Sequence, residues 1–259
     1  MKKRFLFTSF VLFVFLTSLS GQSTKTDEYD VYLFIGQSNM AGRGTMIEED
    51  KRPLSNVWIL NQKGEVVPAV NPLNQYSTIR KELSMQQINP GNSFSQEIVK
   101  QVGRKVLLVV NARGGSSISE WEKGNKQTPF YAEAVRRCKE AQRYGTLRAI
   151  LWHQGESDSA HPENYLDQLA NMVSHLRKDL KAKAVPFIAG EIAPWHKNAS
   201  RFNPMIRTIS TRIANADYVS SEGTTPLIDE TDPHFGRDSQ LLLGKRYADK
   251  VLKMVYNKK

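Results

Sequence analysis

The run Val31-Tyr32-Leu33-Phe34-Ile35 leads directly into Gly36-Gln37-Ser38-Asn39-Met40-Ala41. A short run that is apolar throughout is typical of a parallel strand covered on both faces. The glycine that follows lets the backbone turn tightly. Five more runs of strand length, the last of them weaker, occur at 57–60, 106–110, 149–152, 187–190 and 218–219. We therefore expect a sheet of parallel strands.

Patterns typical of helices lie between these runs. Residues 165–180 and 241–255 each carry an apolar stripe with helical spacing, and 92–102 and 129–144 are also expected to be helical. Strands that alternate with helices predict right-handed crossovers and helices on both faces of the sheet. The fold class that follows is α/β, a three-layer α/β/α domain with a parallel central sheet. Residues 61–92, rich in Pro, Asn and Gln, are expected to form a long loop on the functional side of the sheet.

The first residues have the pattern of an export signal. Lys2-Lys3-Arg4 is a positive segment, the stretch 5–16 is mostly apolar, and Ser18-Leu19-Ser20 supplies small residues near a cleavage position. We expect a signal peptide over 1–21, a single domain over 22–259, and a secreted or periplasmic protein. The apolar stretch is short for a membrane span, and an uncleaved N-terminal anchor is the alternative.

Cys138 is the only cysteine, which excludes a lipobox, a disulfide framework and a zinc–thiolate site. It shares a helical stripe with Phe130, Ala134 and Ala141, so we expect it to be a buried apolar residue. The formal net charge is +10, and the basic residues are spread along the chain without an arginine-rich block. This distribution gives no support for a nucleic-acid partner and suits polyanionic surfaces or acidic polysaccharide instead.

Ser38 lies where the first strand gives way to a turn. In open α/β sheets, ligands bind beyond the carboxyl ends of the strands. The residue also stands near a predicted helix N-terminus, where free N–H groups favour a developing negative charge. We interpret Ser38 as an acyl-transfer nucleophile, and a serine that caps the helix is the alternative.

A pair of glycines follows the run 106–110, in the segment Asn111-Ala112-Arg113-Gly114-Gly115-Ser116-Ser117. Glycines at a strand end present backbone N–H groups without side-chain interference, and the oxyanion of an acyl-transfer reaction needs such donors. We expect Gly114 and Gly115 to contribute to an oxyanion hole, and a plain glycine-rich turn is the alternative.

The segment His153-Gln154-Gly155-Glu156-Ser157-Asp158 brings polar groups together at a buried strand end. Gln154 offers an amide donor, and Glu156 and Asp158 offer carboxylates. A divalent-metal site built from His153, Glu156 and Asp158 is the alternative, and it would need further ligands from elsewhere in the chain. We expect no metal and no cofactor.

The last polar segment, Thr231-Asp232-Pro233-His234-Phe235, precedes the C-terminal helix. A serine hydroxyl needs a neighbouring base, and that base needs a partner that fixes its tautomer. The Asp-x-His spacing fits a carboxylate that orients an imidazole toward Ser38, and triads are defined by geometry rather than by sequence order. The other histidines considered for the base are His161, His175 and His196.

At these four segments together the chain resembles the SGNH/GDSL hydrolase superfamily. More narrowly, it resembles the sialate O-acetylesterase and acetyl xylan esterase group, carbohydrate esterase family six and its relatives. The segments 36–42, 114–121, 153–158 and 232–235 are similar to that group's sequence blocks, and the resemblance extends over residues 30–255. It implies a flavodoxin-like α/β/α fold and metal-free ester hydrolysis.

The resemblance also assigns roles to residues of the four segments. It implies that Ser38 is the nucleophile and His234 the base. The oxyanion hole would combine the N–H of Ser38, the N–H of Gly114 or Gly115, and the side-chain amide of Gln154.

Two departures from the superfamily's pattern bear on these roles. Gln154 stands where the superfamily usually has asparagine, as in the carbohydrate-esterase branch. Asp232 precedes His234 by two residues rather than the usual three, which leaves the triad acid open. We favour Asp232, with Glu156 as the alternate or supporting carboxylate and Asp229 as a third candidate.

The resemblance and the export signal together imply a secreted carbohydrate O-acetylesterase that acts on acetylated xylan or on O-acetylated sialic acid. The sequence does not separate these two substrates. We expect Asn39, Trp121 and Trp195 to bind substrate. The two tryptophans, and also Trp58, could stack on sugar rings, and a place in the core is the alternative for each of the three. The alternative functions are a catalytically silent carbohydrate-binding domain and a phosphate-binding loop at 36–44, which lacks the Gly-Lys-Ser/Thr ending of a P-loop.

Overall fold

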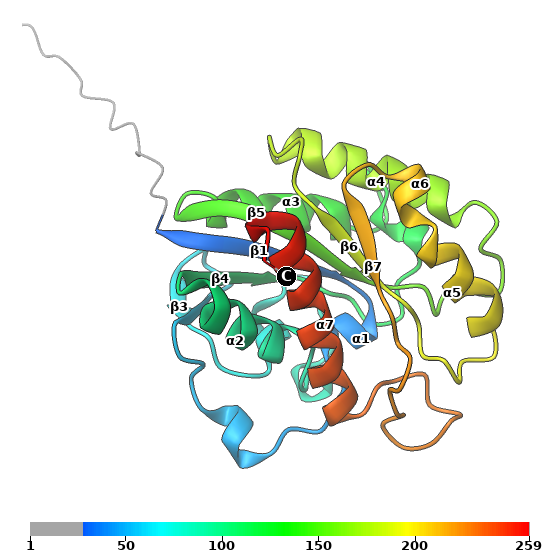
Figure 1. Ribbon diagram of the computed structural model, residues 1–259. Coiled ribbons are helices and arrows are strands. Elements are labelled where there is room, and N and C mark those ends of the chain that lie inside the picture. Colours follow the sequence, from blue (N-terminus) through cyan, green and yellow to red (C-terminus); the bar gives the residue numbers. More distant parts are fainter. Residues whose placement is uncertain (1–27, 259) are drawn as a thin grey trace, which may run out of the picture.

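The computed structural model describes residues 28–258, which form one seven-stranded sheet with helices on both faces (Figure 1). The strands are β1 Tyr29–Gly36, β2 Val57–Leu60, β3 Val66–Pro68, β4 Lys105–Val110, β5 Gly145–His153, β6 Phe187–Gly190 and β7 Ala216–Val219. They lie in the order β3-β2-β4-β1-β5-β6-β7, and only β2 and β3 pair antiparallel. Without the edge hairpin of β2 and β3, the order β4-β1-β5-β6-β7 is that of flavodoxin-like folds. The predicted fold class is confirmed.

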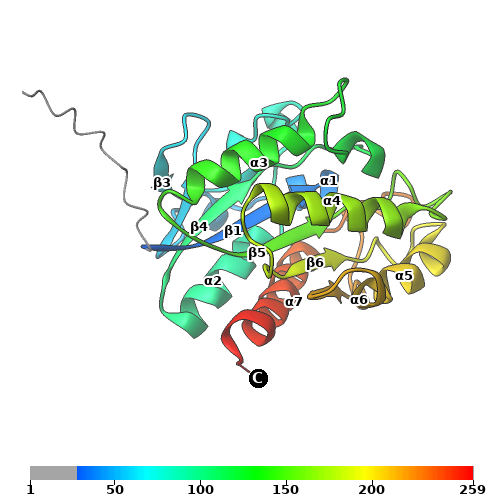
Figure 2. The ribbon, with the colours of Figure 1, turned by 90° about the horizontal axis from the view of Figure 1, so that it is seen from above.

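The helices are α1 Ser38–Ala41, α2 Gly91–Val102, α3 Phe130–Ala141, α4 Tyr165–Asp179, α5 Ala199–Arg207, α6 Ile209–Arg212 and α7 Arg237–Tyr256. Helices α3 to α6 pack on one face of the sheet, and α1, α2 and α7 pack on the other (Figure 2). Alternate residues of β1 serve the two cores, with Leu33 in one and Phe34 in the other. The wholly apolar pattern of this strand follows from its being covered on both faces.

The predicted interior position of Cys138 is confirmed. Its side chain is fully buried on α3 together with Ala134 and Ala141, and burial raises the pKa of the thiol to about 12. Loss of water disfavours the thiolate, so the residue behaves as a small apolar side chain.

Three elements were not predicted from the sequence. Strand β3 is a short run inside a polar segment, and its pairing with β2 is what makes it a strand. Helix α5 contains Pro204, which argues locally against a helix. Burial of Phe202 and Ile206 on α5 and of Ile209 on α6 holds these two short helices against the core. The rest of 61–92 is largely irregular, as predicted, with two short 3-10 turns.

The sheet brings three of the polar segments to one edge. Strands β4 and β5 both pair in parallel with β1, so that Phe34 faces Val110 and Gly36 faces His153. The carboxyl ends of these strands therefore coincide, and the segments that follow them are neighbours. Gly36 has φ 138°, and a Cβ there would lie 2.2 Å from the carbonyl oxygen of His153. Only glycine allows the chain to turn this close to β5.

The predicted signal peptide lies within residues 1–27, which are outside the described part of the chain. Between residues 28 and 258, none of the helices combines the length and the apolar character that a membrane crossing requires.

Candidate active site

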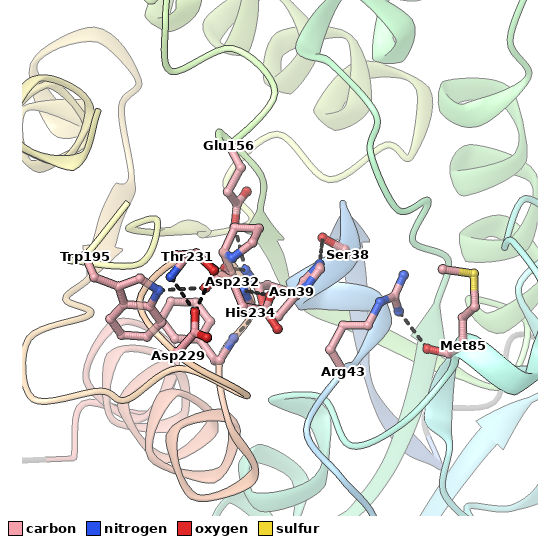
Figure 3. A network of polar contacts seen from close by, with 12 residues as sticks. Ser38, Asn39, Arg43, Met85, Glu156, Trp195, Asp229, Thr231, Asp232 and His234 are labelled. Carbon is pink, nitrogen blue, oxygen red and sulfur yellow. Dashed lines mark hydrogen bonds and ion pairs between the residues drawn. The ribbon is translucent and has the colours of Figure 1, made fainter. Parts of the chain in front are cut away.

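Ser38, His234 and Asp232 form a continuous hydrogen-bonded chain at this edge of the sheet (Figure 3). Ser38 Oγ lies 3.1 Å from His234 Nε2, and His234 Nδ1 lies 2.6 Å from Asp232 Oδ1. With Nδ1 protonated, the imidazole donates to the carboxylate, and Nε2 accepts from the serine hydroxyl. This is the relation of nucleophile, base and orienting acid that a serine hydrolase needs.

Ser38 is the first residue of α1, and its hydroxyl is directed to His234 rather than to the backbone of the helix. The helix cap is Gln37, without a side-chain capping bond. The interpretation of Ser38 as a capping serine is therefore wrong.

The two-residue spacing of Asp232 and His234 has a structural explanation. Asp232 Oδ1 accepts a hydrogen bond from the backbone N–H of His234 at 2.9 Å as well as from the ring. One carboxylate oxygen thus fixes both the backbone and the side chain of the histidine. The indole N–H of Trp195 donates to the carbonyl oxygen of Asp232 at 2.7 Å and holds the same turn from its other side. The Asp229 carboxylate is not part of this chain, because it accepts from the N–H and hydroxyl of Thr231.

The imidazole of His234 is half-buried, and burial lowers its pKa below the ordinary value for histidine. The Asp232 carboxylate opposes this shift, and the nearby Arg43 guanidinium adds to it. A base must be neutral to take a proton, so the lowered pKa keeps His234 competent at mildly acidic pH.

Asn39 does not reach the surface, which corrects the expectation that it binds substrate. Its side-chain amide donates to Glu156 Oε1 at 2.6 Å and to the carbonyl oxygen of Pro233 at 3.1 Å. Its carbonyl oxygen accepts from the N–H of Phe235 at 3.1 Å. The residue next to the serine therefore holds the chain on both sides of His234.

Glu156 makes no hydrogen bond to His234. Its Oε1 accepts from Asn39, and its Oε2 is buried with no hydrogen-bond partner among residues 28–258. Burial raises the pKa of the Glu156 carboxyl to about 7. Of the two carboxylates considered as the triad acid, Asp232 is therefore the one that contacts the imidazole.

Gly114 and Gly115 lie beside Ser38, as predicted. Both line a pocket of about 380 Å³ together with Ser38, Glu156 and His234. A Cβ at Gly114 would lie 3.6 Å from the Cβ of Ser38. Within residues 28–258 the backbone N–H groups of Ser38 and Gly114 have no acceptor, so both are available to a ligand.

The Gln154 side chain is not directed into this pocket, contrary to the expectation of an oxyanion donor. It is fully buried, and its amide nitrogen donates to the carbonyl oxygen of Ser116 and to Asp158 Oδ2. Its carbonyl oxygen accepts from the hydroxyl of Tyr165. Gln154 thus holds the glycine-rich segment against the end of β5.

The three tryptophans have different surroundings. Trp121 is completely buried against Trp152 and donates to Ser116 Oγ, so it belongs to the core and the expectation of sugar stacking is wrong. Trp58 packs on Tyr29 at the amino end of β1, away from the site. Trp195 is partly exposed and lines a pocket of about 350 Å³ next to the serine pocket.

The side chains of the alternative metal site do not converge. His153 is buried, with Nδ1 3.1 Å from the hydroxyl of Tyr247, whereas Glu156 and Asp158 face Asn39 and Gln154. In the described part of the chain, no group of three or more His, Cys, Asp and Glu side chains is arranged to hold a metal ion.

The site contains residues that sequence reasoning did not single out. Arg43, Lys81 and Met85 line the serine pocket, and so does His196, which had been considered only as a base. Lys81 and Met85 come from the long loop 61–92. Of these residues, only Arg43 has a local sequence signal for a place at the site, because it is a basic residue between Gly42 and Gly44, directly after the serine motif.

Comparisons with known proteins agree with this fold. The profile of the family described as "Carbohydrate esterase, sialic acid-specific acetylesterase" matches residues 28–253. A probable carbohydrate esterase of Arabidopsis thaliana is 26% identical over 245 residues, which cover 86% of this chain and 90% of that relative.

Two solved structures are also similar. The X-ray structure of an Arabidopsis thaliana protein has a TM-score of 0.78 at 25% identity and covers 88% of this chain and 99% of its own. A carbohydrate acetylesterase from Xanthomonas citri has a TM-score of 0.64 at 14% identity, with 88% of this chain and 57% of that one covered.

Fold and comparisons together place the chain among the SGNH-type carbohydrate esterases. Because the family profile spans nearly all of the described residues, the protein belongs to the carbohydrate esterase family of sialic acid-specific acetylesterases. Membership of this family indicates a hydrolase that acts on acetyl esters.

The bonds of Asn39 lead to a prediction about the position of His234. Asn39→Ala should lower kcat for an aryl acetate by about tenfold to a hundredfold with little change in KM, because the histidine segment loses its anchor. Asn203→Ala is the matched control, since Asn203 is also buried and also makes a pair of backbone bonds, both to Ile192. Both variants should lose about 1–3 kcal/mol of stability in urea denaturation. A wild-type kcat in Asn39→Ala would contradict the positioning role.

Proposed function

We propose that this protein is an exported carbohydrate O-acetylesterase. In this proposal it removes acetyl groups from sugar hydroxyls, on acetylated xylan or O-acetylated sialic acid, through a serine acyl-enzyme. The observation that carries the proposal is the chain of hydrogen bonds from Ser38 through His234 to Asp232, at the wall of an open pocket. Family membership supports the acetyl ester as the bond that is cleaved.

In the first step, Ser38 Oγ attacks the acetyl carbonyl carbon while His234 Nε2 takes its proton. The negative charge that develops on the carbonyl oxygen is stabilised by backbone donors. The free N–H groups of Ser38 and Gly114 support this role, because both belong to residues that line the pocket. The sugar oxygen then leaves with the proton held by His234, and the acetyl group stays on Ser38.

In the second step, a water molecule replaces the sugar. His234 takes a proton from the water, the hydroxide attacks the acetyl-enzyme carbonyl, and the same donors stabilise the second oxyanion. Acetate leaves and Ser38 regains its proton from His234. The Asp232 carboxylate keeps its hydrogen bond to Nδ1 and stabilises the positive charge that the imidazole carries in each step.

The nucleophile is tested with Ser38→Ala. Wild-type protein should release acetate from aryl acetate and from acetylated sugars and should be labelled once by an organophosphonate, whereas Ser38→Ala should lose more than about a thousandfold in rate and all labelling. Ser119→Ala, at an exposed serine of the short 3-10 helix Ile118–Trp121 that follows the glycine-rich segment, is the control. Full hydrolysis by Ser38→Ala would refute the acyl-enzyme. Wild-type protein that binds sugars without hydrolysis or labelling would instead indicate a binding domain.

The triad acid is tested with Asp232→Asn and Glu156→Gln. Asp232→Asn should lower kcat by about 10⁴, since asparagine cannot hold the imidazole in the same tautomer or stabilise its charge. Glu156→Gln should cost no more than about tenfold, because glutamine keeps the oxygen that accepts from Asn39.

The pH profile of kcat/KM distinguishes titration of His234 from titration of Glu156. In wild type and Glu156→Gln, the acidic limb of kcat/KM should have its midpoint below the ordinary histidine pKa, since burial lowers the pKa of His234. A midpoint near 7 in wild type that is absent in Glu156→Gln would assign the limb to Glu156 instead.

Export is tested with the full-length chain. The basic start and the apolar stretch of residues 5–16 support a cleaved signal peptide. When the chain is expressed in a bacterial host, N-terminal sequencing of the protein recovered outside the cytoplasm should begin near residue 22. An intact Met1 on all of the protein would contradict cleavage.

A further inference from the structure

The folded chain leaves the expected oxyanion hole one donor short. The resemblance of the sequence blocks implies three donors, and the side-chain amide of Gln154 is one of them. That amide is turned into the interior, where it donates to Ser116 and Asp158. The other two expected donors, the backbone N–H groups of Ser38 and Gly114, remain at the pocket. A carbonyl oxygen that becomes an anion beside Ser38 can therefore accept from a further group on the pocket wall.

Arg43 is a cation on this wall that has no acidic partner. It is half-buried, and within residues 28–258 no carboxylate forms an ion pair with it. Burial lowers the pKa of its guanidinium, and no neighbouring anion opposes this shift. A cation that is partly withdrawn from water without a counterion lowers stability, so its retention at a site indicates a negative charge that it meets there.

The guanidinium of Arg43 is held in a fixed orientation. Its Nη1 donates to the carbonyl oxygen of Gly42 at 2.7 Å and to that of Met85 at 2.9 Å. The nitrogens Nη2 and Nε have no acceptor in the described part of the chain. Nη2 lies 2.8 Å from the position that a Cβ would occupy at Gly114, and the Cβ of Ser38 lies 3.6 Å from the same point. Figure 3 shows the guanidinium beside Ser38, on the side away from Trp195.

Gly114 is what allows the guanidinium to come so close. The residue does not have a left-handed φ, so its backbone conformation does not require glycine. A Cβ there would lie too close to Nη2 for both atoms to keep their places. The missing side chain thus leaves Nη2 room next to the N–H of the same residue. Alanine at this position would move the guanidinium and keep both its charge and that N–H.

Lys81, the other cation that lines the pocket, is placed differently. Its side chain is exposed to solvent, and its Nζ lies 3.5 Å from the position of a Cβ at Gly115. Water screens an exposed ammonium, so its charge contributes little. The charge of Arg43, by contrast, acts at the reacting groups, since it contributes to the lowered pKa of His234. Arg43 is therefore the cation that is placed to donate to an atom bound at Ser38.

We propose that Arg43 is a catalytic residue whose Nη2 donates the third hydrogen bond to the oxyanion, beside the N–H groups of Ser38 and Gly114. This inference rests on the proposed function. When Ser38 Oγ bonds to the acetyl carbon, an electron pair of the C=O bond moves onto the oxygen, and the guanidinium stabilises that charge without giving up a proton. The pair returns to the C=O bond when the sugar oxygen leaves with the proton held by His234. A charged donor that is fixed before the reaction stabilises the anion more strongly than a neutral amide does.

The test compares the neutral ester with an anionic mimic of the intermediate. It measures kcat and KM for an aryl acetate and Ki for phenylboronic acid, at one pH at which His234 is neutral in every variant. The boron atom bonds to Ser38 Oγ and becomes tetrahedral and negatively charged, as the intermediate does. Arg43→Gln should lower kcat by about a hundredfold and raise Ki by about tenfold or more, with KM changed by less than about threefold.

Arg80→Gln is the matched control. Arg80 also donates to backbone carbonyl oxygens of the long loop, those of Gln75 and Lys81, and it does not line the serine pocket. This variant should keep the wild-type kcat and Ki, which separates the oxyanion role from a role in holding the loop. Urea denaturation checks that each variant is folded.

Gly114→Ala provides a second measurement. The added methyl group should displace Nη2 and lower kcat by about tenfold or more. Combined with Arg43→Gln, it should lower kcat by no more than about threefold further, because both substitutions remove the same donor. If Arg43→Gln fails to fold, Gly114→Ala decides by itself, and a wild-type kcat and Ki in that variant would overturn the inference.

Three other results would also overturn it. An unchanged Ki in Arg43→Gln would mean that the guanidinium does not contact the anion. A raised KM with unchanged kcat would assign Arg43 to binding of the ester. Losses in Arg43→Gln and Gly114→Ala that multiply in the double variant would mean that the two residues act separately. Failure of the proposed function is a separate outcome, since wild-type protein would then neither release acetate from the aryl acetate nor bind the boronic acid.

Discussion

The buried amide of Asn39 is the junction on which the arrangement of the site depends. The serine motif follows β1 and the histidine segment precedes α7, so some 200 residues of chain separate Ser38 from His234. Asn39 joins them, because it is covalently attached to Ser38 and hydrogen-bonded to the residues on both sides of His234. Its bond to Glu156 adds the segment that follows β5. Three separate parts of the chain are thus fixed by one side chain that water does not reach.

Burial sets the charge of the groups around this junction. It lowers the pKa of His234, which favours the neutral imidazole, and it raises the pKa of Glu156, which reduces the negative charge on this carboxyl near neutral pH. Asp232 keeps its contact with the imidazole, and the Arg43 guanidinium adds positive potential on the opposite side of Ser38. The result is a pocket suited to the negative charge that would develop in the proposed acyl transfer.

Sequence reasoning was most reliable where local signals were strong. The apolar runs marked six of the strands, since a strand covered on both faces has a uniform composition. The sequence places Ser38 and Gly114 after strands and His234 before the C-terminal helix, and the three residues do meet at one pocket. The expectations for Asn39, Trp121 and Gln154 were wrong for one common reason: each is a polar or aromatic residue beside the site whose side chain is turned into the interior. Sequence position gives proximity, whereas side-chain direction depends on neighbours that are distant in the chain.

The amino-acid sequence by itself determined the three-layer architecture and the segments that carry the chemistry, because apolar periodicity and strand-end glycines are local properties of the chain. Only the tertiary structure showed that Asp232, and not Glu156, is the carboxylate in contact with the imidazole of His234. This contact depends on the folded backbone, which brings Asp232 to within 2.6 Å of the ring. It also brought Lys81 and Arg43 to the serine pocket. Their meeting there depends on how a long irregular loop packs across the end of the sheet, and no periodic pattern in the sequence encodes that packing.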